Sequence, residues 1–260
     1  LLLEVSWEAL EHAGLPPEAT TYALPPEWRR RWNLRRYGFH GLSHAWAARR
    51  AAELAGRSAS GLRVVTAHLG AGASLAAVRD GCSVDTTMGF TPLEGLVMAT
   101  RSGSVDPGLV LWLQEHVGTP PEELAATLEH RSGLLGLAGT ADMREVLIAA
   151  GERADDGADT SGPATTVAPA DARLALGVYV HRLRGAVAAM AAALGGLDAL
   201  VFTGGVGENA PEVRRLAADG LAFLGVALDP GRIAGERPGD DGAATAAARV
   251  ACRPGANDFD

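Results

Sequence analysis

The sequence predicts a mixed α/β fold, and three features of its pattern carry that prediction. Apolar, strand-like segments separated by glycine turns occupy residues 63–89, an alanine-rich helical pattern covers about 170–194, and a continuous apolar strand follows it. A group of strands followed by helix, buried strand and helix is typical of a sheet covered by helices. Folds of this kind bind ligands where their strands end.

The first ninety residues alternate between helical and extended patterns. In chain order they predict an amphipathic helix (1–12), an extended connection with four prolines (16–28) and a helix closed by a glycine (42–56). Three strands follow, at 63–70, 74–81 and 82–89. Asp80-Gly81 predicts a tight turn between the second and third strands. The three strands therefore form a β-meander.

Helical patterns dominate the remainder of the chain. They cover about 107–117, 120–130, 141–150 and 170–194, and a further helix is expected to begin near Pro211 after the strand LDALVF. The polar, small-residue stretch 151–169 is predicted to be an exposed loop, and the Gly/Asp/Ala-rich stretch 233–247 is predicted to be mobile.

Composition excludes several classes of protein. The 260 residues are 47% apolar and 21% charged, which is enough for a sizeable core. Because no run of 18 apolar residues occurs and the first residues are acidic rather than basic, we expect no membrane span, no signal peptide and a cytoplasmic location. The net charge of −8 argues against nucleic acid or anionic membranes as partners.

Cysteine and lysine usage narrows the chemistry further. The two cysteines, Cys82 and Cys252, are far apart and show no metal-ligand spacing, so neither a structural zinc site nor a disulfide framework is predicted. All 23 basic residues are arginines, which excludes a phosphate loop ending in GK[ST]. A phosphate group would have to be held by backbone amides, arginine and histidine.

Two glycine-rich turns are candidates for that task. In VFTGGVGEN (201–209) a buried strand runs into glycines and then a helix, and HLGAGAS (68–74) joins two adjacent strands. Bare backbone at such points lets amide groups approach an anion closely. Each turn also has a structural interpretation, the first as a plain strand–helix turn and the second as a hairpin turn with His68 in the core.

One arginine and one histidine are candidate catalytic groups. Arg101 lies among Thr, Ser and Gly in the irregular segment 85–107, where its planar donor fork suits a transferring phosphoryl group. The alternative is a surface arginine paired with Asp106. His40, between Phe39 and Gly41, lies at a turn where a ring can face a cleft, although its position taken alone favours a structural role.

Five ordered blocks together closely resemble the acetate kinase family. The blocks are RRYGFHGLSH (35–44), HLGAGAS (68–74), DTTMGFTPLEGLVMATRSG (85–103), SGLLGLAGTADMR (132–144) and FTGGVGEN (202–209). The resemblance implies the actin/hexokinase-like (ribonuclease H-like) ATPase fold, mainly its second domain. It also implies transfer of the γ-phosphoryl group of ATP to acetate, or the reverse from acetyl phosphate and ADP, with Mg²⁺, by a homodimer.

The resemblance also assigns roles to individual residues. It implies His40 and Arg101 as catalytic residues that stabilise the transition state, and Phe39 and Pro92 as the pocket for the acetate methyl group. The implied nucleotide-binding residues are His68, Gly70, Gly72, Asp142, Met143, Arg144, Gly205, Gly207, Glu208 and Asn209. No metal ligands are assigned, because the closing acidic pair of the family is not matched by Asp258 and Asp260.

The chain departs from the family pattern at several points. Ala71 stands where the family often has Asn, and Glu8 falls at the place of an aspartate important to catalysis. The stretch LLLEVSWEALEHAGL looks more like a helix of polyketide-synthase ketosynthase domains, so we interpret residues 1–11 as foreign or chance similarity. We expect 1–34 to be a remnant of a first domain or a foreign segment plus connection, 35–250 the nucleotide-binding domain, and 251–260 a divergent tail.

Several functions therefore stay open from the sequence. The first is an acetate kinase-like phosphotransferase with a shortened chain, whose activity is impaired because the first domain is missing. The second is a nucleotide-binding remnant that associates with a partner chain without turnover. Propionate and butyrate kinases are close competitors, since one or two methylene groups change binding by only about 1–3 kcal/mol each. A ketosynthase-related interaction segment at the N-terminus is the last alternative.

Overall fold

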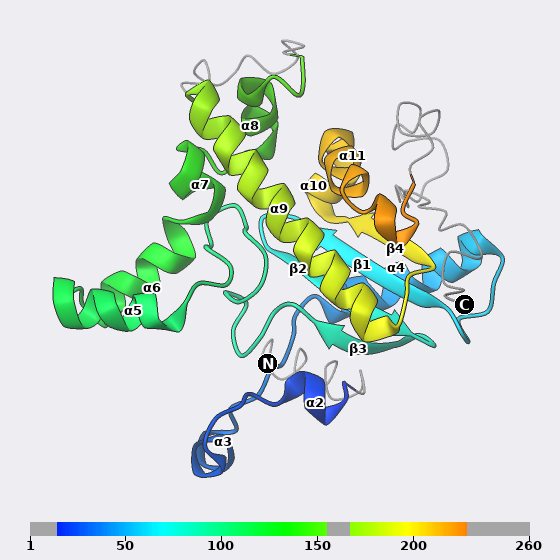
Figure 1. Cartoon of the computed structure of the whole chain (residues 1–260), viewed down its shortest axis with the longest axis horizontal. Coiled ribbons are helices and arrows are strands. Elements are labelled where there is room, and N and C mark those ends of the chain that lie inside the picture. The colour runs from blue at the N-terminus through cyan, green and yellow to red at the C-terminus, as the bar shows by residue number, and fades with distance from the viewer. Residues whose placement is uncertain (1–14, 155–166, 228–260) are drawn as a thin grey trace.

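The computed structural model describes residues 15–154 and 167–227 (Figure 1). The helix predicted for 1–12, the stretch 233–247 and most of the loop predicted for 151–169 lie outside the described residues. The same holds for Glu8, Cys252, Asp258 and Asp260.

Four strands form one mixed sheet at the centre of the fold. They are β1 (Arg63–Leu69), β2 (Ala73–Arg79), β3 (Cys82–Thr86) and β4 (Ala199–Thr203), in the order β3-β2-β1-β4. β2 pairs antiparallel with both β1 and β3, whereas β4 pairs parallel with β1. The predicted meander is thus confirmed, and the φ angles of 55° at Asp80 and 78° at Gly81 give the expected tight turn.

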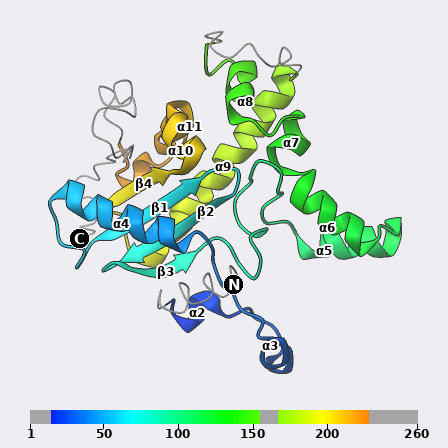
Figure 2. The same ribbon diagram turned by 180° about the vertical axis from the view of Figure 1, so that it is seen from behind.

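One long helix covers each face of the sheet. Helix α9 (Pro169–Leu194) crosses one face, and α4 (Gly41–Ala55) lies on the other (Figures 1 and 2). Apolar side chains on the α4 face pack against alanines of that helix, while alternate strand residues such as Val65 and Leu75 join the larger core under α9. Because both faces are covered, β1, β2 and β4 are mostly buried and largely apolar, whereas the edge strand β3 is polar and partly exposed.

The remaining elements surround this sandwich. They are α2 (Pro17–Thr20), α3 (Pro26–Trp32), α5 (Pro107–Trp112), a π-helical turn (Leu113–Val117), α6 (Pro121–His130), α7 (Gly133–Ala138), α8 (Met143–Ala150), α10 (Gly204–Asn209), α11 (Pro211–Asp219) and a 3₁₀ turn (Ala222–Leu224). In Figure 1, α5 and α6 extend away from the sheet, whereas α8 packs along α9.

Two predictions of secondary structure are wrong. Residues 16–28 are not a purely extended connection, because Pro17 and Pro26 each begin a short helix. Proline is tolerated at the first helical position, where its missing N–H would have no partner anyway. The double glycine at 204–205 is not a turn before a helix either, since both residues belong to the first turn of α10. Helix α7 was not predicted.

Candidate functional site

The parallel pairing of β1 and β4 brings the two glycine segments together. His68 of β1 lies beside Thr203 of β4, so the loop after β1 and the start of α10 leave the same edge of the sheet. Gly204 has a φ of 79°, and a Cβ built on it would lie 2.7 Å from the carbonyl oxygen of Leu69. Only glycine therefore allows the two backbones to approach this closely.

A cleft of about 610 Å³ opens between these segments and α8. It is lined by Gly70, Ala71, Ala99, Leu134, Ala141, Asp142, Met143, Arg144, Leu147, Arg153, Tyr179, Gly205, Val206, Asn209 and Ala210. Six of the ten residues predicted to bind nucleotide are among them. The structure thus brings together three sequence blocks that are separated by about 60 residues each.

Two polar residues of the cleft were missed by the sequence reasoning. Arg153 follows α8, and Tyr179 comes from the middle of α9. The Tyr179 hydroxyl is buried and has no hydrogen-bond partner within the described part of the chain, and burial raises its pKa above the usual value. A lone tyrosine in an alanine-rich helix was the only sequence signal for it.

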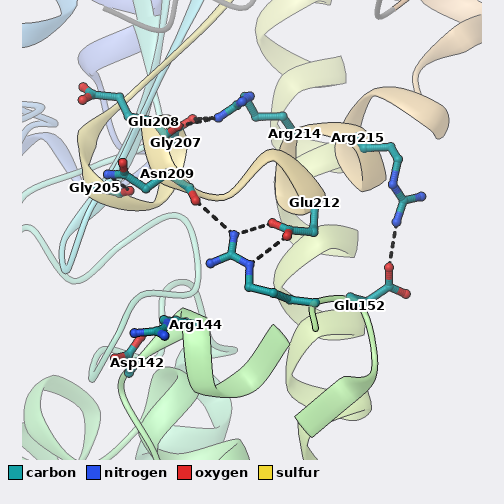
Figure 3. Close-up of polar contacts among 11 residues, drawn as sticks. Asp142, Arg144, Glu152, Gly205, Gly207, Glu208, Asn209, Glu212, Arg214 and Arg215 are labelled. Atoms are coloured by element: carbon teal, nitrogen blue, oxygen red, sulfur yellow. Dashed lines mark hydrogen bonds and ion pairs between the residues drawn. The ribbon is translucent and has the colours of Figure 1, made fainter. Parts of the chain in front are cut away.

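Arginine side chains hold α10 in place at the edge of the cleft (Figure 3). Arg153 makes two contacts with the Glu212 carboxylate, one of them 2.8 Å from Nε to Oε1, and also donates to the carbonyl oxygen of Asn209. The buried Arg214 donates to the carbonyl oxygens of Gly207 and Glu208 at 2.8 and 2.7 Å. Burial, the largest single influence, raises the pKa of Glu212, but hydrogen bonds, above all the one from Arg153, and the charges of Arg153 and Arg214 together lower it below the usual value.

Three predicted nucleotide-binding side chains have structural partners of their own. Glu208 accepts a 3.2 Å hydrogen bond from the Gly204 amide, and Asn209 donates to the carbonyl oxygen of Gly205 at 2.9 Å. Asp142 caps α8 by accepting from the amide of Arg144 at 2.8 Å. Figure 3 shows Asp142 and Arg144 across the gap from Gly205 and Asn209.

The predicted catalytic residues lie beside the glycine loop. The rings of His40 and His68 stack with centroids 4.3 Å apart. A Cβ built on Gly72 would lie 3.3 Å from Arg101 Nη1 and 3.6 Å from His40 Nε2, and one on Gly70 would lie 3.6 Å from His68 Nε2. Residues 70–72 therefore separate the cleft from a group of one arginine and two histidines.

His40 adopts a costly backbone conformation. It is the N-cap of α4 with a φ of 62°, in the left-handed region that non-glycine residues rarely adopt. Such strain, of order 1–3 kcal/mol, is concentrated at functional sites. The His40 imidazole lies beside Gly72.

Helix α7 fixes the loop that carries Arg101. Gly133 has a φ of 62°, and a Cβ on it would lie 2.2 Å from the carbonyl oxygen of Met98 and 2.7 Å from that of Arg101. The amides of Leu134 and Leu135 donate to the carbonyl oxygens of Met98 and Ala99, each at 3.0 Å. The SGLLG block thus acts as a clamp on the loop before Arg101.

Arg101 does not form the pair with Asp106 that its sequence context also allowed. The Asp106 carboxylate instead caps α5, accepting from the amide of Gly108 at 2.8 Å. Among the described residues, the hydrogen bond found for the Arg101 guanidinium is a long one, 3.8 Å, to the sulfur of Met98. Its donors are therefore available on the Gly72 side.

The two residues predicted for the acetyl pocket lie on adjacent segments. The amide of Tyr37 donates to the carbonyl oxygen of Gly89 at 3.0 Å, and the Tyr37 and Phe90 rings lie 5.8 Å apart. Phe39 packs against the edge of the core, and Pro92 is half-buried two residues beyond Phe90. Tyr22 and Arg36 both bond to the Glu94 carboxylate, which ties the N-terminal connection to this segment.

The histidines of this group are held in their neutral form. Burial lowers the pKa of His40 to about 4, assisted by the charges of His68 and Arg101. Burial likewise lowers the pKa of His44 to about 3, with smaller contributions from its two neighbouring histidines. The pKa of His68 is also lowered by burial, although the Glu208 carboxylate opposes the shift.

Comparisons with known proteins identify the family. Residues 6–253 match the sequence model of the Acetokinase family. The acetate kinases of Gloeobacter violaceus and Pseudothermotoga lettingae are 49% and 46% identical over 241 and 219 residues, which cover 92% and 84% of this chain but 56% and 50% of theirs.

The chain belongs to the acetokinase family. Among solved structures, an acetate kinase of Porphyromonas gingivalis and a propionate kinase of Francisella tularensis match it with TM-scores of 0.77 and 0.76, each at 36% identity. Each match covers 92% of this chain and 56% of the other. The predicted actin/hexokinase-like fold is confirmed, and this acetokinase-family chain spans about half the length of the curated relatives it matches.

The described residues contain neither a cluster suited to a metal ion nor a helix suited to span a membrane. No cluster of three or more His, Cys, Asp or Glu side chains suited to hold a metal ion occurs in 15–154 and 167–227. Across the same ranges, no helix is long and apolar enough to cross a membrane.

We expect the clamp of this acetokinase-family chain to depend on Gly133. Gly133→Ala should destabilise the fold by about 3 kcal/mol, because left-handed strain and overpacking against Met98 act together. Gly139→Ala is the matched control: its φ is 77°, but a Cβ there meets no atom within 4 Å. The control should lose only about 1–2 kcal/mol in urea unfolding. Equal losses for both variants would contradict the clamp.

We also expect stability to fall in mild acid. The three histidines have lowered pKa values in the folded state, so only the unfolded chain binds their protons as the pH falls below about 6.5. The free energy of unfolding should therefore decrease from neutral pH towards about pH 4. His44→Gln should make that slope shallower. A slope unchanged by His44→Gln would refute the assignment.

Proposed function

We propose that this chain is the nucleotide-binding part of a carboxylate kinase that exchanges a phosphoryl group between ATP and acetate. The observation that carries the proposal is the cleft lined by Gly70, Gly205 and Arg144, which ends at the loop beside His40 and Arg101. Its volume of about 610 Å³ lies in the range of small-molecule sites. Relatives named acetate kinase support the same activity.

We assign residues 35–250 to the nucleotide-binding domain. Residues 1–34 are a connection or the remnant of another unit, and 251–260 a divergent tail. Within the domain, the nucleoside lies between α8 and α10, near Asp142, Met143 and Arg144. The phosphates lie along the backbone of residues 70–72 and 204–207, where the absence of side chains lets amides approach the oxygens.

The reaction then takes place on the far side of the glycine loop. An acetate oxygen attacks the γ-phosphorus while the bond from that phosphorus to the β,γ-bridging oxygen breaks, which yields acetyl phosphate and ADP. The transition state is loose, with negative charge spread over three equatorial oxygens. Arg101 donates to those oxygens as a planar cation, and His40 donates as a neutral imidazole. Phe39 and Pro92 contact the methyl group.

Mg²⁺ is the metal expected with the nucleotide, where it would neutralise charge on the phosphates. Among the described residues, no group of three or more His, Cys, Asp or Glu side chains is placed to hold a metal ion. We therefore assign it no ligands and no step. A cytoplasmic location and a homodimer are also part of the proposal, and light scattering of the purified chain tests the dimer.

A second acceptor is favoured by one specific observation. The propionate kinase of Francisella tularensis matches this chain as well as the acetate kinase of Porphyromonas gingivalis does. Because one methylene changes kcat/KM by only about 10- to 200-fold, acetate, propionate and butyrate should be compared directly. The preferred acceptor is the one with the highest kcat/KM.

We expect ADP to bind the full chain saturably in calorimetry. Gly205→Asp should weaken that binding about tenfold or more, because the carboxylate would face the phosphates in a site of low dielectric. A Cβ on Gly205 meets no atom within 4 Å, so the substitution should not disturb packing. Gly205→Asn, of the same shape without the charge, is the matched control and should bind more tightly than Asp. A full chain that fails to bind ADP refutes the nucleotide site.

We expect Arg101→Lys to lower the rate of acetyl phosphate formation about 100-fold, because lysine cannot reproduce the bidentate contact with phosphoryl oxygens. The exposed Arg215, which pairs with Glu152 and Asp219, provides the control, and Arg215→Lys should leave the rate unchanged. If the full chain binds ADP but forms no acetyl phosphate, kinase activity of this chain is refuted and a nucleotide-binding protein without turnover is supported.

A further inference from the structure

A chain of buried polar groups lies behind His40, between α4 and the sheet. The Nδ1 atom of His40 is 2.9 Å from the hydroxyl of Ser74, which lies 2.8 Å from Nε2 of His44. On the other side of the His44 ring, Nδ1 is 2.8 Å from the hydroxyl of Thr66. Ser74 and Thr66 are fully buried and His44 is 5% exposed, so protein groups rather than solvent must satisfy their hydrogen bonds.

Pairing every buried donor allows only two arrangements. Each neutral imidazole has one N–H donor and one acceptor nitrogen, and each hydroxyl has one proton to donate and two lone pairs that accept. Among the described residues, the acceptors within reach of the buried Ser74 hydroxyl are the two ring nitrogens, so it donates to one histidine and accepts from the other. Once the direction at one end is fixed, every proton in the chain is fixed, including the one on His40.

Thr66 decides the direction. Its hydroxyl is 2.8 Å from His44 Nδ1 and 3.4 Å from the carbonyl oxygen of Ala76, a distance at the outer limit of hydrogen bonding. In the reversed relay, His44 Nδ1–H would donate to Thr66, and the Thr66 proton would be left with the long contact to Ala76. The short contact therefore favours donation from Thr66 to His44 Nδ1. The Nε2–H of His44 then donates to Ser74, and Ser74 donates to Nδ1 of His40.

We propose that Thr66, His44 and Ser74 form a hydrogen-bond relay that holds the ring proton of His40 on Nε2, where it donates to an anion lying beside Gly72. The three are positioning residues that act through His40. The proposal rests on the proposed function for the identity of that anion, a nucleotide phosphate or the transferring phosphoryl group.

The surroundings of His40 agree with this assignment. Its Nε2 lies 3.6 Å and Arg101 Nη1 3.3 Å from the position that a Gly72 Cβ would occupy, so both groups border one space at the backbone of the loop. The low pKa of His40 means that the ring can donate there only as the Nε2–H tautomer. His68 has a parallel arrangement, since its Nδ1 lies 2.9 Å from the Ser43 hydroxyl and its Nε2 borders Gly70.

Nitrogen-15 NMR of the histidine rings in the full chain tests the proposal, because it distinguishes a protonated nitrogen from one with a lone pair. Without ligand at neutral pH, we expect both His40 and His44 to be protonated at Nε2. Thr66→Val, an isosteric change that removes the hydroxyl, should reduce the tautomer preference about fivefold, the ratio that one net hydrogen bond sets. Thr66→Ser keeps the hydroxyl and should restore the preference.

A matched control separates the relay from a general loss of a buried hydroxyl. Thr86 is also buried and donates to the carbonyl oxygen of Leu75, outside the relay, so Thr86→Val should leave the His40 signals unchanged. If Thr66→Val does not fold, Ser74→Ala interrupts the relay beside His40 and should have the same effect. The proposal is overturned if His40 carries its proton on Nδ1, or if neither variant alters the tautomer ratio.

Titration with inorganic phosphate tests the donor role directly. The Nε2–H proton of His40 should shift as phosphate binds, and an unchanged signal at saturating ADP or phosphate overturns that part of the proposal. Because the tautomer is measured without ligand, failure of the proposed function can be distinguished from failure of the relay proposal. In that case ADP would not bind in calorimetry, while the tautomer of His40 would still depend on Thr66 and Ser74.

Discussion

The parallel pairing of β1 with β4 is the constraint on which the rest of the site depends. It sets His68 beside Thr203, so that both strands end at one edge and both continue into glycine. Since parallel neighbours need a long crossover, α9 must run the length of the sheet between them, and this also covers one face. The same connection therefore builds the core and places the loop 70–72 against α10.

The layer between α4 and the sheet changes character along its length. At one end, alanines of α4 pack on valines of β1, β2 and β4 in a dry apolar cluster. At the other end, the same faces carry Thr66, His68, Ser74 and Thr203 opposite His40, Ser43 and His44. Buried polar groups are stable only when they satisfy one another, which explains why the polar end is a connected network. That network lies where the strands meet the cleft.

Much of the fold and part of the site were predictable from the sequence, and the features that were not predicted have physical causes. The meander, α4 and α9 follow from apolar periodicity, which local sequence carries. Helix α7 was missed because GLLGLA contains glycine at both ends of a turn, and its stability comes from hydrogen bonds to residues 98–101 rather than from propensity. Arg153 and Tyr179 reach the cleft only through the packing of α8 on α9. The register of His44 with Thr66 and Ser74 likewise requires the sheet.

Neutral histidines beside the Arg101 guanidinium avoid electrostatic repulsion. Three protonated histidines next to Arg101 would repel one another and the guanidinium, and burial lowers the pKa values of His40 and His44 far enough to prevent this. A neutral imidazole then contributes a directed donor without adding charge, so that Arg101 supplies the charge and the histidines the geometry. Such a division requires the ring protons to be on the correct nitrogens. Within a buried layer, the hydroxyls of Ser43, Thr66 and Ser74 are the groups placed to ensure it.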